Sequence, residues 1–156
     1  MPHIHTAPGQ VDNTVEVFIV YRDKVLLRLH DKYKVWLSVG GHVELDEDPN
    51  QAALREVKEE VGLDVTLYTH RQTPSFGEAD YRELIPPFFL NRHRINATHE
   101  HVTYTYFAST NSDNVIPESP QDEWHWFTKT ELKNSKGKIK DSVRYYAITA
   151  LETLAS

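Results

Sequence analysis

Alternating apolar and polar positions near the start of the chain predict a β-hairpin. Apolar side chains dominate residues 14–21 (TVEVFIVY) and 24–29 (KVLLRL), and a short turn at Arg22 and Asp23 separates the two runs. Runs of this kind with turn residues between them are typical of paired antiparallel strands. The preceding residues 1–13 are polar and rich in His, Pro and Gly, so we expect a flexible arm or an edge strand there.

The hydrophobic spacing becomes helical after residue 48, and the flanking residues mark both ends of a helix. Asp48 is a good N-cap, Pro49 suits the first helical position, and Gln51 completes a capping box. Gly62 is a natural stop because a residue in the left-handed conformation commonly ends a helix. We expect the face that packs against the core to consist of three residues at helical spacing: Leu54, Val57 and Val61.

Apolar runs elsewhere predict a second helix and several more strands. Residues 141–154 read as a closing helix, whose apolar stripe consists of Val143, Ala147, Ala150, Leu151 and Leu154. The pattern Thr128-x-x-Glu131 predicts a short helical turn. Short strands or apolar segments are expected at 35–39, 63–68, 85–90, 102–108 and 124–127. The order of strands, one helix, more strands and one helix predicts an α/β fold with a mixed sheet covered by helices.

The composition narrows the class of protein. With 156 residues, 39% of them hydrophobic, the chain suits a single domain, residues 1–156, with one core. No apolar run approaches the roughly 18 residues of a membrane span, and the first ten residues do not resemble a signal peptide. We therefore expect a cytoplasmic protein without a membrane partner. The absence of cysteine excludes disulfides, thiolate metal sites and a cysteine nucleophile. A formal net charge of −6 argues against duplex nucleic acid as a partner.

Three carboxylates gather on one side of the predicted helix over residues 49–61. Glu56, Glu59 and Glu60 fall within roughly 100° of arc, because each helical residue advances the side chain by about 100°. Like charges at this spacing destabilise a helix by about 0.2–0.5 kcal/mol per pair. Magnesium prefers oxygen ligands and is usually shared between carboxylates and phosphates, so it would relieve this repulsion. A solvated, Glu-rich surface is the other interpretation of these three residues taken alone.

The wider segment from Gly41 to Leu63 favours the metal site, because its spacing resembles the Nudix box. This motif defines the Nudix hydrolase superfamily, and all nine of its specified positions are met. They are Gly41, Glu47, Arg55, Glu56, Val57, Glu59, Glu60, Gly62 and Leu63.

The resemblance implies a fold, a reaction and a set of metal ligands. Nudix domains are α/β/α sandwiches with a mixed sheet between helices, and their box forms a loop, a helix and a second loop. They typically hydrolyse a nucleoside diphosphate linked to another group, using Mg²⁺ or alternatively Mn²⁺. Carried over position by position, the metal ligands are the carboxylates of Glu56, Glu59 and Glu60 and the backbone carbonyl of Gly40.

The family also suggests roles for residues around these ligands. Glu47 and Arg55 would form an ion pair that holds the loop against the helix, and Arg55 would help to orient the carboxylates. Some members place a further metal-binding or catalytic glutamate in a loop that corresponds to residues 111–122. Glu118 is the candidate here, with an ordinary loop glutamate as the alternative. One departure from the family is Val39, which stands where many members have a proline before the double glycine.

The chemistry of anhydride hydrolysis agrees with these assignments. Water must attack an anionic phosphate, so a cation has to neutralise charge and a base has to take a proton. Glu56 is one candidate for this base, Glu118 is a second, and Glu100 is a weaker rival.

Residues that would recognise the substrate are harder to identify from the sequence. Several aromatic side chains are candidates for stacking on a base, although most aromatic residues are simply core: Trp36, Phe76, Tyr81, Phe88 and Phe89. Arginines that would meet phosphates are Arg71, Arg82, Arg92 and Arg94, with solvated surface arginines as the default. Two pairs of histidines, His3 with His5 and His99 with His101, have spacings that permit chelation, but no third ligand is visible, so surface or core histidines are the favoured interpretation.

The leading hypothesis is therefore a magnesium-dependent hydrolase of a small nucleotide, acting on a phosphoanhydride bond. A non-catalytic Nudix domain that senses a nucleotide is the alternative, and the complete box argues against it. Dimers are common among relatives, so a homodimer remains open, and the identity of the nucleotide is not indicated by the sequence.

Overall fold

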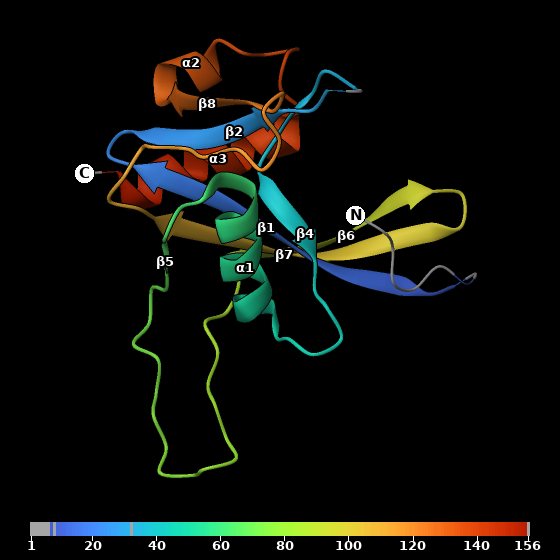
Figure 1. Cartoon of the computed structure of the whole chain (residues 1–156), viewed down its shortest axis with the longest axis vertical. Coiled ribbons are helices and arrows are strands. Elements are labelled where there is room, and N and C mark those ends of the chain that lie inside the picture. Colours follow the sequence, from blue (N-terminus) through green and yellow to red (C-terminus); the bar gives the residue numbers. More distant parts are fainter. Residues whose placement is uncertain (1–6, 8, 32, 156) are drawn as a thin grey trace.

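A mixed β-sheet between helices forms the body of the protein, in the computed structural model that describes residues 7, 9–31 and 33–155 (Figure 1). The sheet has eight strands: β1 (Val11–Tyr21), β2 (Lys24–Leu29), β3 (Trp36–Leu37), β4 (Val39–His42), β5 (Thr66–Leu67), β6 (Phe89–Asn96), β7 (His99–Ser109) and β8 (Glu123–Thr128). The helices are α1 (Pro49–Val61), α2 (Lys129–Lys133) and α3 (Asp141–Leu154). The predicted α/β/α sandwich with a mixed sheet is confirmed.

β1 organises the sheet because it pairs with three other strands. It runs parallel to β7 over ten residues, from Val11 opposite Glu100 to Val20 opposite Ser109. On its other side, residues 14–17 pair antiparallel with β4, and the last two residues pair with β2 in the predicted hairpin. The strand begins at Val11, so residues 11–13, for which the sequence left an arm or an edge strand open, are part of a central strand.

The helices cover opposite faces of the sheet and enclose two apolar clusters. α1 lies on one face, where Val57 and Val61 pack with alternate residues of β1 such as Val17. α3 covers the other face, and its Ala147 packs with Phe18, one position further along β1. Because successive strand side chains point to opposite faces, β1 supplies both clusters.

The helix α1 begins and ends where its sequence signals predict. The side chain of Asp48 accepts a hydrogen bond from the Gln51 amide, and the Gln51 side chain accepts one from the Asp48 amide. The prediction for the buried face was wrong at Leu54, which is 44% exposed. The helix is rotated so that small residues and one carboxylate face the sheet instead, and the buried set is Ala52, Ala53, Glu56, Val57 and Val61.

The segment between α1 and β7 differs most from the sequence prediction. The strand expected over 63–68 is reduced to the two residues of β5, and the strand expected over 85–90 begins only at Phe89. Pro86 and Pro87 explain the second shift, because proline lacks the amide hydrogen that a sheet ladder needs. Residues 68–88 instead form a long connection that extends away from the sandwich (Figure 1). The side chain of Asn50 anchors its end by bonding both the amide and the carbonyl of Ile85.

Replacing Gly62 by alanine should destabilise the fold. Gly62 ends α1 with φ at +69°, and a Cβ there would lie 3.0 Å from the Cβ of Ile116. A left-handed conformation costs an L-residue about 1–2 kcal/mol, so we expect Gly62→Ala to lower the free energy of unfolding in urea by at least that amount. Gly77→Ala is the matched control, because nothing lies within 4 Å of its Cβ position. Equal midpoints for the two variants would contradict this account.

Candidate active site

An acidic cleft of about 440 Å³ opens where α1, β1 and β4 meet. The Nudix-like segment supplies three of its carboxylates from α1, and the remainder come from β1 and from the loop before β8. These acidic residues are Glu16, Glu56, Glu59, Glu60, Glu118 and Asp122. The structure therefore brings the predicted glutamates of α1 and the predicted loop glutamate into one cavity, although Glu118 lies about sixty residues away in the sequence.

Arg55 connects the loop before α1 to the carboxylates of the cleft. Its Nη2 lies 2.6 Å from Glu47 Oε1, and its Nε donates to the other oxygen of the same carboxylate at 3.0 Å. Its Nη1 donates to Glu56 at 3.0 Å and to Glu59 at 3.1 Å, while its Nη2 also donates to the carbonyl of His42 at 3.0 Å. One guanidinium therefore fixes the loop, the end of β4 and two carboxylates at once.

Burial and repulsion from neighbouring carboxylates disfavour the ionised forms of Glu56 and Glu60. The Glu56 side chain is 3% exposed, and burial raises its pKa although Arg55 opposes the shift. Burial, reinforced by the nearby charge of Glu56, raises the pKa of Glu60 to about 8, while Arg28 and the Gly40 amide act in the opposite direction. Arg55 and Arg28 thus offset only part of this penalty, and a bound cation would offset more of it.

Gly40 lies so close to β1 that a side chain would not fit. A Cβ on Gly40 would lie 2.6 Å from the backbone oxygen of Val15. The adjacent Val39 is fully buried and pairs with Val17 in the sheet, so it packs in the core at the position where many family members have proline. The pairing of residues 39–41 with β1 therefore places the Gly40 backbone at the wall of the cleft without the rigidity of a proline.

The loop of Glu118 is tied directly to the end of α1. The amide of Glu118 donates to the carbonyl of Glu60 at 3.0 Å, and the amide of Ile116 donates to the carbonyl of Val61 at 2.9 Å. These backbone bonds place Glu118 beside the glutamates of α1. Glu100, the weaker rival, lies on β7 in an ion pair with Arg92 at 3.1 Å and does not line the cleft.

Three charged residues of the cleft were not predicted from the sequence: Glu16, Arg28 and Asp122. Glu16 accepts hydrogen bonds from Thr105 at 2.7 Å and Ser38 at 3.2 Å, and burial raises its pKa. Arg28 lies 3.5 Å from Asp122 and belongs to β2. Glu16 is a charged residue inside the apolar run of residues 14–21. A charge in the middle of such a run is the signal that would have identified it.

The aromatic residues and arginines considered as substrate contacts lie outside this cleft. Trp36 packs edge-on against Phe127, Phe88 stacks on Phe107, and Phe89 stacks on Tyr146, so all three contact other aromatic side chains of the protein, although Phe88 is still 36% exposed. Phe76 and Tyr81 are exposed on the long connection. None of the four arginines Arg71, Arg82, Arg92 and Arg94 lines the cleft.

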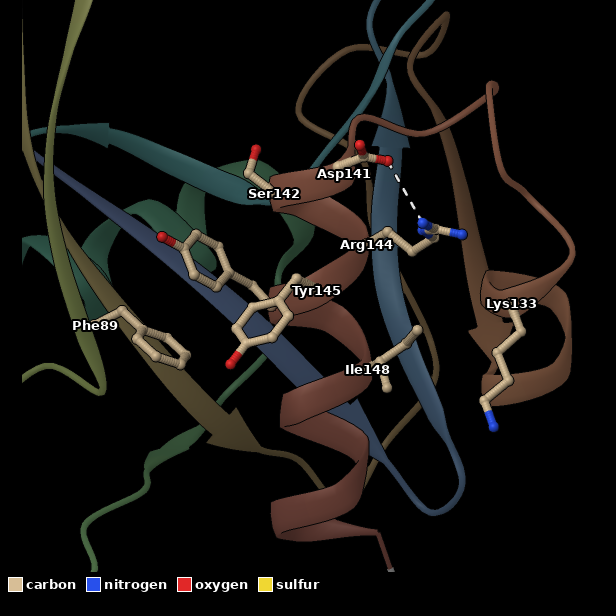
Figure 2. Close-up of a pocket in the computed structure, with 8 residues that line it drawn as sticks. Phe89, Lys133, Asp141, Ser142, Arg144, Tyr145 and Ile148 are labelled. Carbon is tan, nitrogen blue, oxygen red and sulfur yellow. Dashed lines mark hydrogen bonds and ion pairs between the residues drawn. The ribbon is translucent and has the colours of Figure 1, made fainter.

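A larger groove of about 770 Å³ lies along α3 (Figure 2). Phe89 and Tyr145 form one side of it, and Asp141 on its rim pairs with Arg144 at 3.4 Å. This groove is larger than the acidic cleft, but it contains none of the acidic residues of the box. The acidic cleft therefore stays the candidate for the catalytic cavity.

The structure describes only one of the two histidine pairs. His99 and His101 are buried on β7. His3 and His5 lie outside the residues that the structure describes.

No helix within the described part of the chain has the length and apolar character needed to cross a membrane.

Comparison with known proteins gives a consistent result. The family model described as the NUDIX domain matches residues 12–147. An 8-oxo-dGTP diphosphatase from Proteus vulgaris is 39% identical over 88 residues, which make up 56% of this chain and 74% of that protein. A NUDIX-family hydrolase from Clostridium perfringens has a TM-score of 0.78 and 36% identity, covering 91% of this chain and 97% of its own. A MutT NUDIX hydrolase from Burkholderia pseudomallei shares the fold, with a TM-score of 0.61 and 21% identity over 94% of this chain and 99% of its own.

Removing the charge of Glu47 should weaken the fold through Arg55. Hydrogen bonds to charged groups contribute about 1.5–3 kcal/mol when they are shielded from water, and Glu47 is 11% exposed. We expect Glu47→Gln to lower the free energy of unfolding by about 1–2 kcal/mol in urea titrations. Glu44→Gln, in the same loop but exposed, should change it by less than about 0.5 kcal/mol. A Glu47→Gln variant as stable as the Glu44→Gln variant would show that this ion pair does not hold the loop.

The stabilising effect of Glu47 should also depend on pH. The hydrogen bond from Arg55 lowers the pKa of Glu47 below its ordinary value of 4.5. A lowered pKa in the folded state contributes stability above pH 4.5, and this contribution disappears as the pH falls through the folded-state pKa. Unfolding free energies measured from pH 7 down to pH 3 should therefore converge for the parent chain and Glu47→Gln. A constant difference over this range would contradict the assignment.

Proposed function

We propose that this chain, which belongs to the Nudix family of hydrolases, cleaves a phosphoanhydride bond of a nucleoside triphosphate or another nucleoside diphosphate derivative. Water attacks phosphorus in this reaction, and a divalent cation, Mg²⁺ or alternatively Mn²⁺, assists it. The observation that carries the proposal is the location of the three glutamates of the box, Glu56, Glu59 and Glu60, in one cleft. The family match over residues 12–147 supports the same reaction class.

The donor set fits a hard divalent cation. Carboxylate and carbonyl oxygens are the ligands that Mg²⁺ prefers, and Mg²⁺ keeps several waters instead of filling its shell with protein groups. The pKa of Glu60 is raised because burial and the neighbouring charge of Glu56 disfavour its ionised form, and a bound cation would favour that form. The ion would be held by the carboxylates of the box and of the loop before β8, together with a backbone carbonyl: Glu56, Glu59, Glu60, Glu118 and Gly40. When bound, such an ion neutralises phosphate charge and lowers the pKa of a coordinated water.

The chain itself supplies orientation and a base. Arg55 fixes the carboxylates of Glu56 and Glu59 by direct hydrogen bonds, so these groups do not have to reorganise when a substrate binds. Glu56 is buried beside Glu60, and a carboxylate in that position takes a proton from water at the cleft wall more readily than an exposed one. Glu118, whose backbone amide donates to the Glu60 carbonyl, provides a further carboxylate in the cleft and is the other candidate for the base.

A nucleotide substrate agrees with the comparison. The relative from Proteus vulgaris is named an 8-oxo-dGTP diphosphatase, so oxidised and ordinary nucleoside triphosphates belong in the first assay, together with nucleotide sugars and dinucleoside polyphosphates. Purified chain with Mg²⁺ should release a phosphate-bearing product from at least one of them. Tight nucleotide binding measured by calorimetry, with no turnover across the panel, would favour a nucleotide sensor and contradict the enzymatic proposal.

Glu59→Gln and Glu60→Gln should each lower kcat by at least about 100-fold, because each variant removes a proposed metal ligand. The fold should persist, as measured by circular dichroism and thermal unfolding. Asp64→Asn is the matched control, since Asp64 follows the same helix but its side chain is 93% exposed. Unchanged turnover in both glutamate variants would remove the box from the mechanism.

Glu118→Gln distinguishes a functional carboxylate from an ordinary loop residue. If Glu118 takes the proton or holds the cation, kcat should fall by about 10²–10⁴-fold, which is the range for a general base. The hydrogen bond that positions the loop comes from the backbone amide, so it survives the substitution. A kcat within twofold of the parent chain would make Glu118 an ordinary loop residue and leave Glu56 as the candidate for the base.

A further inference from the structure

Four buried titratable side chains meet where β1, β4 and β7 lie side by side. Asp12 is 1% exposed, His42 is 6% exposed, His99 is 4% exposed and His101 is 9% exposed. Burial of an ionisable group is costly unless a partner compensates it, so a cluster of one carboxylate and three imidazoles requires a physical explanation. None of these residues belongs to the acidic donor set proposed above.

Strand pairing holds three of these side chains in fixed positions. Asp12 and His101 are direct neighbours across the parallel pair of β1 and β7. His42 lies on β4, on the other side of β1, where it pairs with Thr14. Groups carried by adjacent strands are positioned more precisely than groups on loops, which favours the fixed geometry that a metal site needs.

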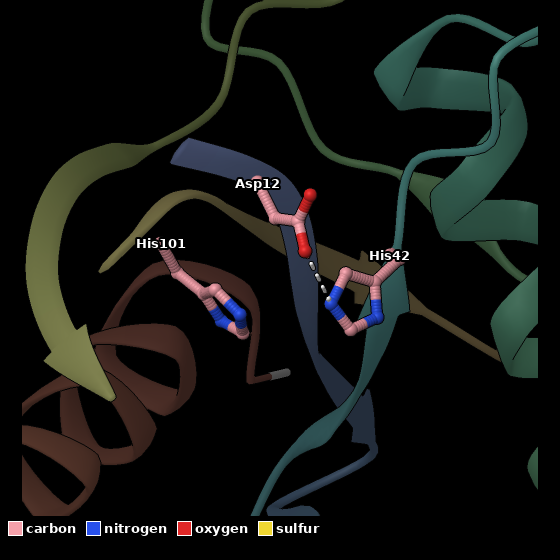
Figure 3. Close-up of side chains that lie close together, drawn as sticks. All are labelled: Asp12, His42 and His101. Atoms are coloured by element: carbon pink, nitrogen blue, oxygen red, sulfur yellow. Dashed lines mark ion pairs between the residues drawn. The ribbon is translucent and has the colours of Figure 1, made fainter. Parts of the chain in front are cut away.

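The ligand atoms lie at distances that suit a small cation. Asp12 Oδ2 lies 3.3 Å from His42 Nε2, and one ligand atom from each of Asp12, His42 and His101 falls within 4.8 Å of the other two. Figure 3 shows the three side chains directed toward one another from their separate strands. Bond lengths of about 2.0–2.1 Å around a tetrahedral ion separate its ligands by about 3.3–3.4 Å, so the Asp12–His42 distance already matches.

The chemistry of this cluster differs from that of the acidic cleft. Imidazole nitrogens with one carboxylate suit Zn²⁺ and related transition-metal ions, whereas Mg²⁺ prefers oxygen ligands alone. Two imidazoles and a carboxylate also leave a coordination position open. His42 and His101 line the same cleft as the glutamates of α1, so that open position is accessible from the substrate side.

His99 lies where a supporting residue for such a site is expected. Its Nε2 lies 3.3 Å from Asp12 Oδ2 and 3.1 Å from His101 Nε2, so it contacts two of the three ligands. Residues that hydrogen-bond to metal ligands fix their orientation and raise their basicity.

We propose that Asp12, His42 and His101 form a second metal site, which binds a transition-metal dication of the Zn²⁺ class, with His99 as the residue that positions the ligands. The site is independent of the hydrolytic proposal, because it uses different residues and a different type of ligand. Because His42 and His101 line the cleft, a bound ion would lie within reach of a substrate held at the proposed Mg²⁺ site.

The test uses the full chain, freed of metal with a chelator and titrated with Co²⁺ alone. A bound Co²⁺ ion with nitrogen ligands and low coordination number absorbs visible light far more strongly than Co²⁺ surrounded by oxygen ligands, so the two sites give different spectra. We expect an intense band that saturates at one Co²⁺ per chain and disappears when Zn²⁺ is added. Zn²⁺ should also raise the thermal unfolding midpoint, because binding only to the folded state stabilises it.

Variants assign the band to particular residues. Asp12→Asn and His101→Gln should each weaken Zn²⁺ binding by at least about 100-fold, and His99→Gln by about 10–100-fold, which is the range for residues that support ligands. The double variant Glu59→Gln, Glu60→Gln should keep the band, because it alters only the acidic donor set. His125→Gln is a further control, since His125 is exposed and pairs with Glu131 at 2.9 Å. Circular dichroism of the metal-free variants confirms folding, and if Asp12→Asn does not fold, His101→Gln decides the outcome.

Two results would overturn the proposal. The first is the absence of an intense band and of any Zn²⁺-dependent rise in the unfolding midpoint of the parent chain, which would make the cluster a hydrogen-bonded network only. The second is a band that disappears in the double glutamate variant but persists in His101→Gln, which would place the ion among the carboxylates of α1.

Discussion

The guanidinium of Arg55 is the contact on which the geometry of the acidic cleft depends. It bonds Glu47 in the loop, the His42 carbonyl at the end of β4, and two carboxylates on its own helix. A buried carboxylate such as Glu56 is tolerated next to the apolar core because this cation compensates part of its charge. Arg55 therefore permits a cluster of acidic groups without fully neutralising it, and the proposed cation would supply the remaining positive charge.

Much of the acidic site was predictable because its information is local in the sequence. The segment from Gly41 to Leu63 folds as one loop and one helix, so residue spacing translates directly into spatial proximity. The ends of α1 follow from the capping box at Asp48 and from the stop at Gly62, and α3 spans the predicted 141–154. Such signals act over three or four residues and do not depend on the rest of the fold.

The remaining features depend on strand pairing, which residue spacing does not specify. Glu16 bonds Thr105 from across 89 positions of the chain, and no local pattern connects the two. The pair His99 and His101 seemed to lack a third ligand for the same reason, since Asp12 and His42 reach it only through β1 and β4.

The error at Leu54 has a different cause. Ala52 and Ala53 let α1 approach the sheet closely, and a pattern search that gives weight only to large apolar residues overlooks this packing face.

The two halves of β1 have different roles. The side chains on one of its faces are polar in the first half, with Asp12, Thr14 and Glu16, and apolar in the second half, with Phe18 and Val20 under α3. Because the two halves are consecutive along a single strand, a substitution in the first half alters the cleft without touching the aromatic packing beneath α3. Substitutions in the first half of β1 can therefore change what the enzyme recognises during evolution. The second half, which stabilises the fold, can stay constant.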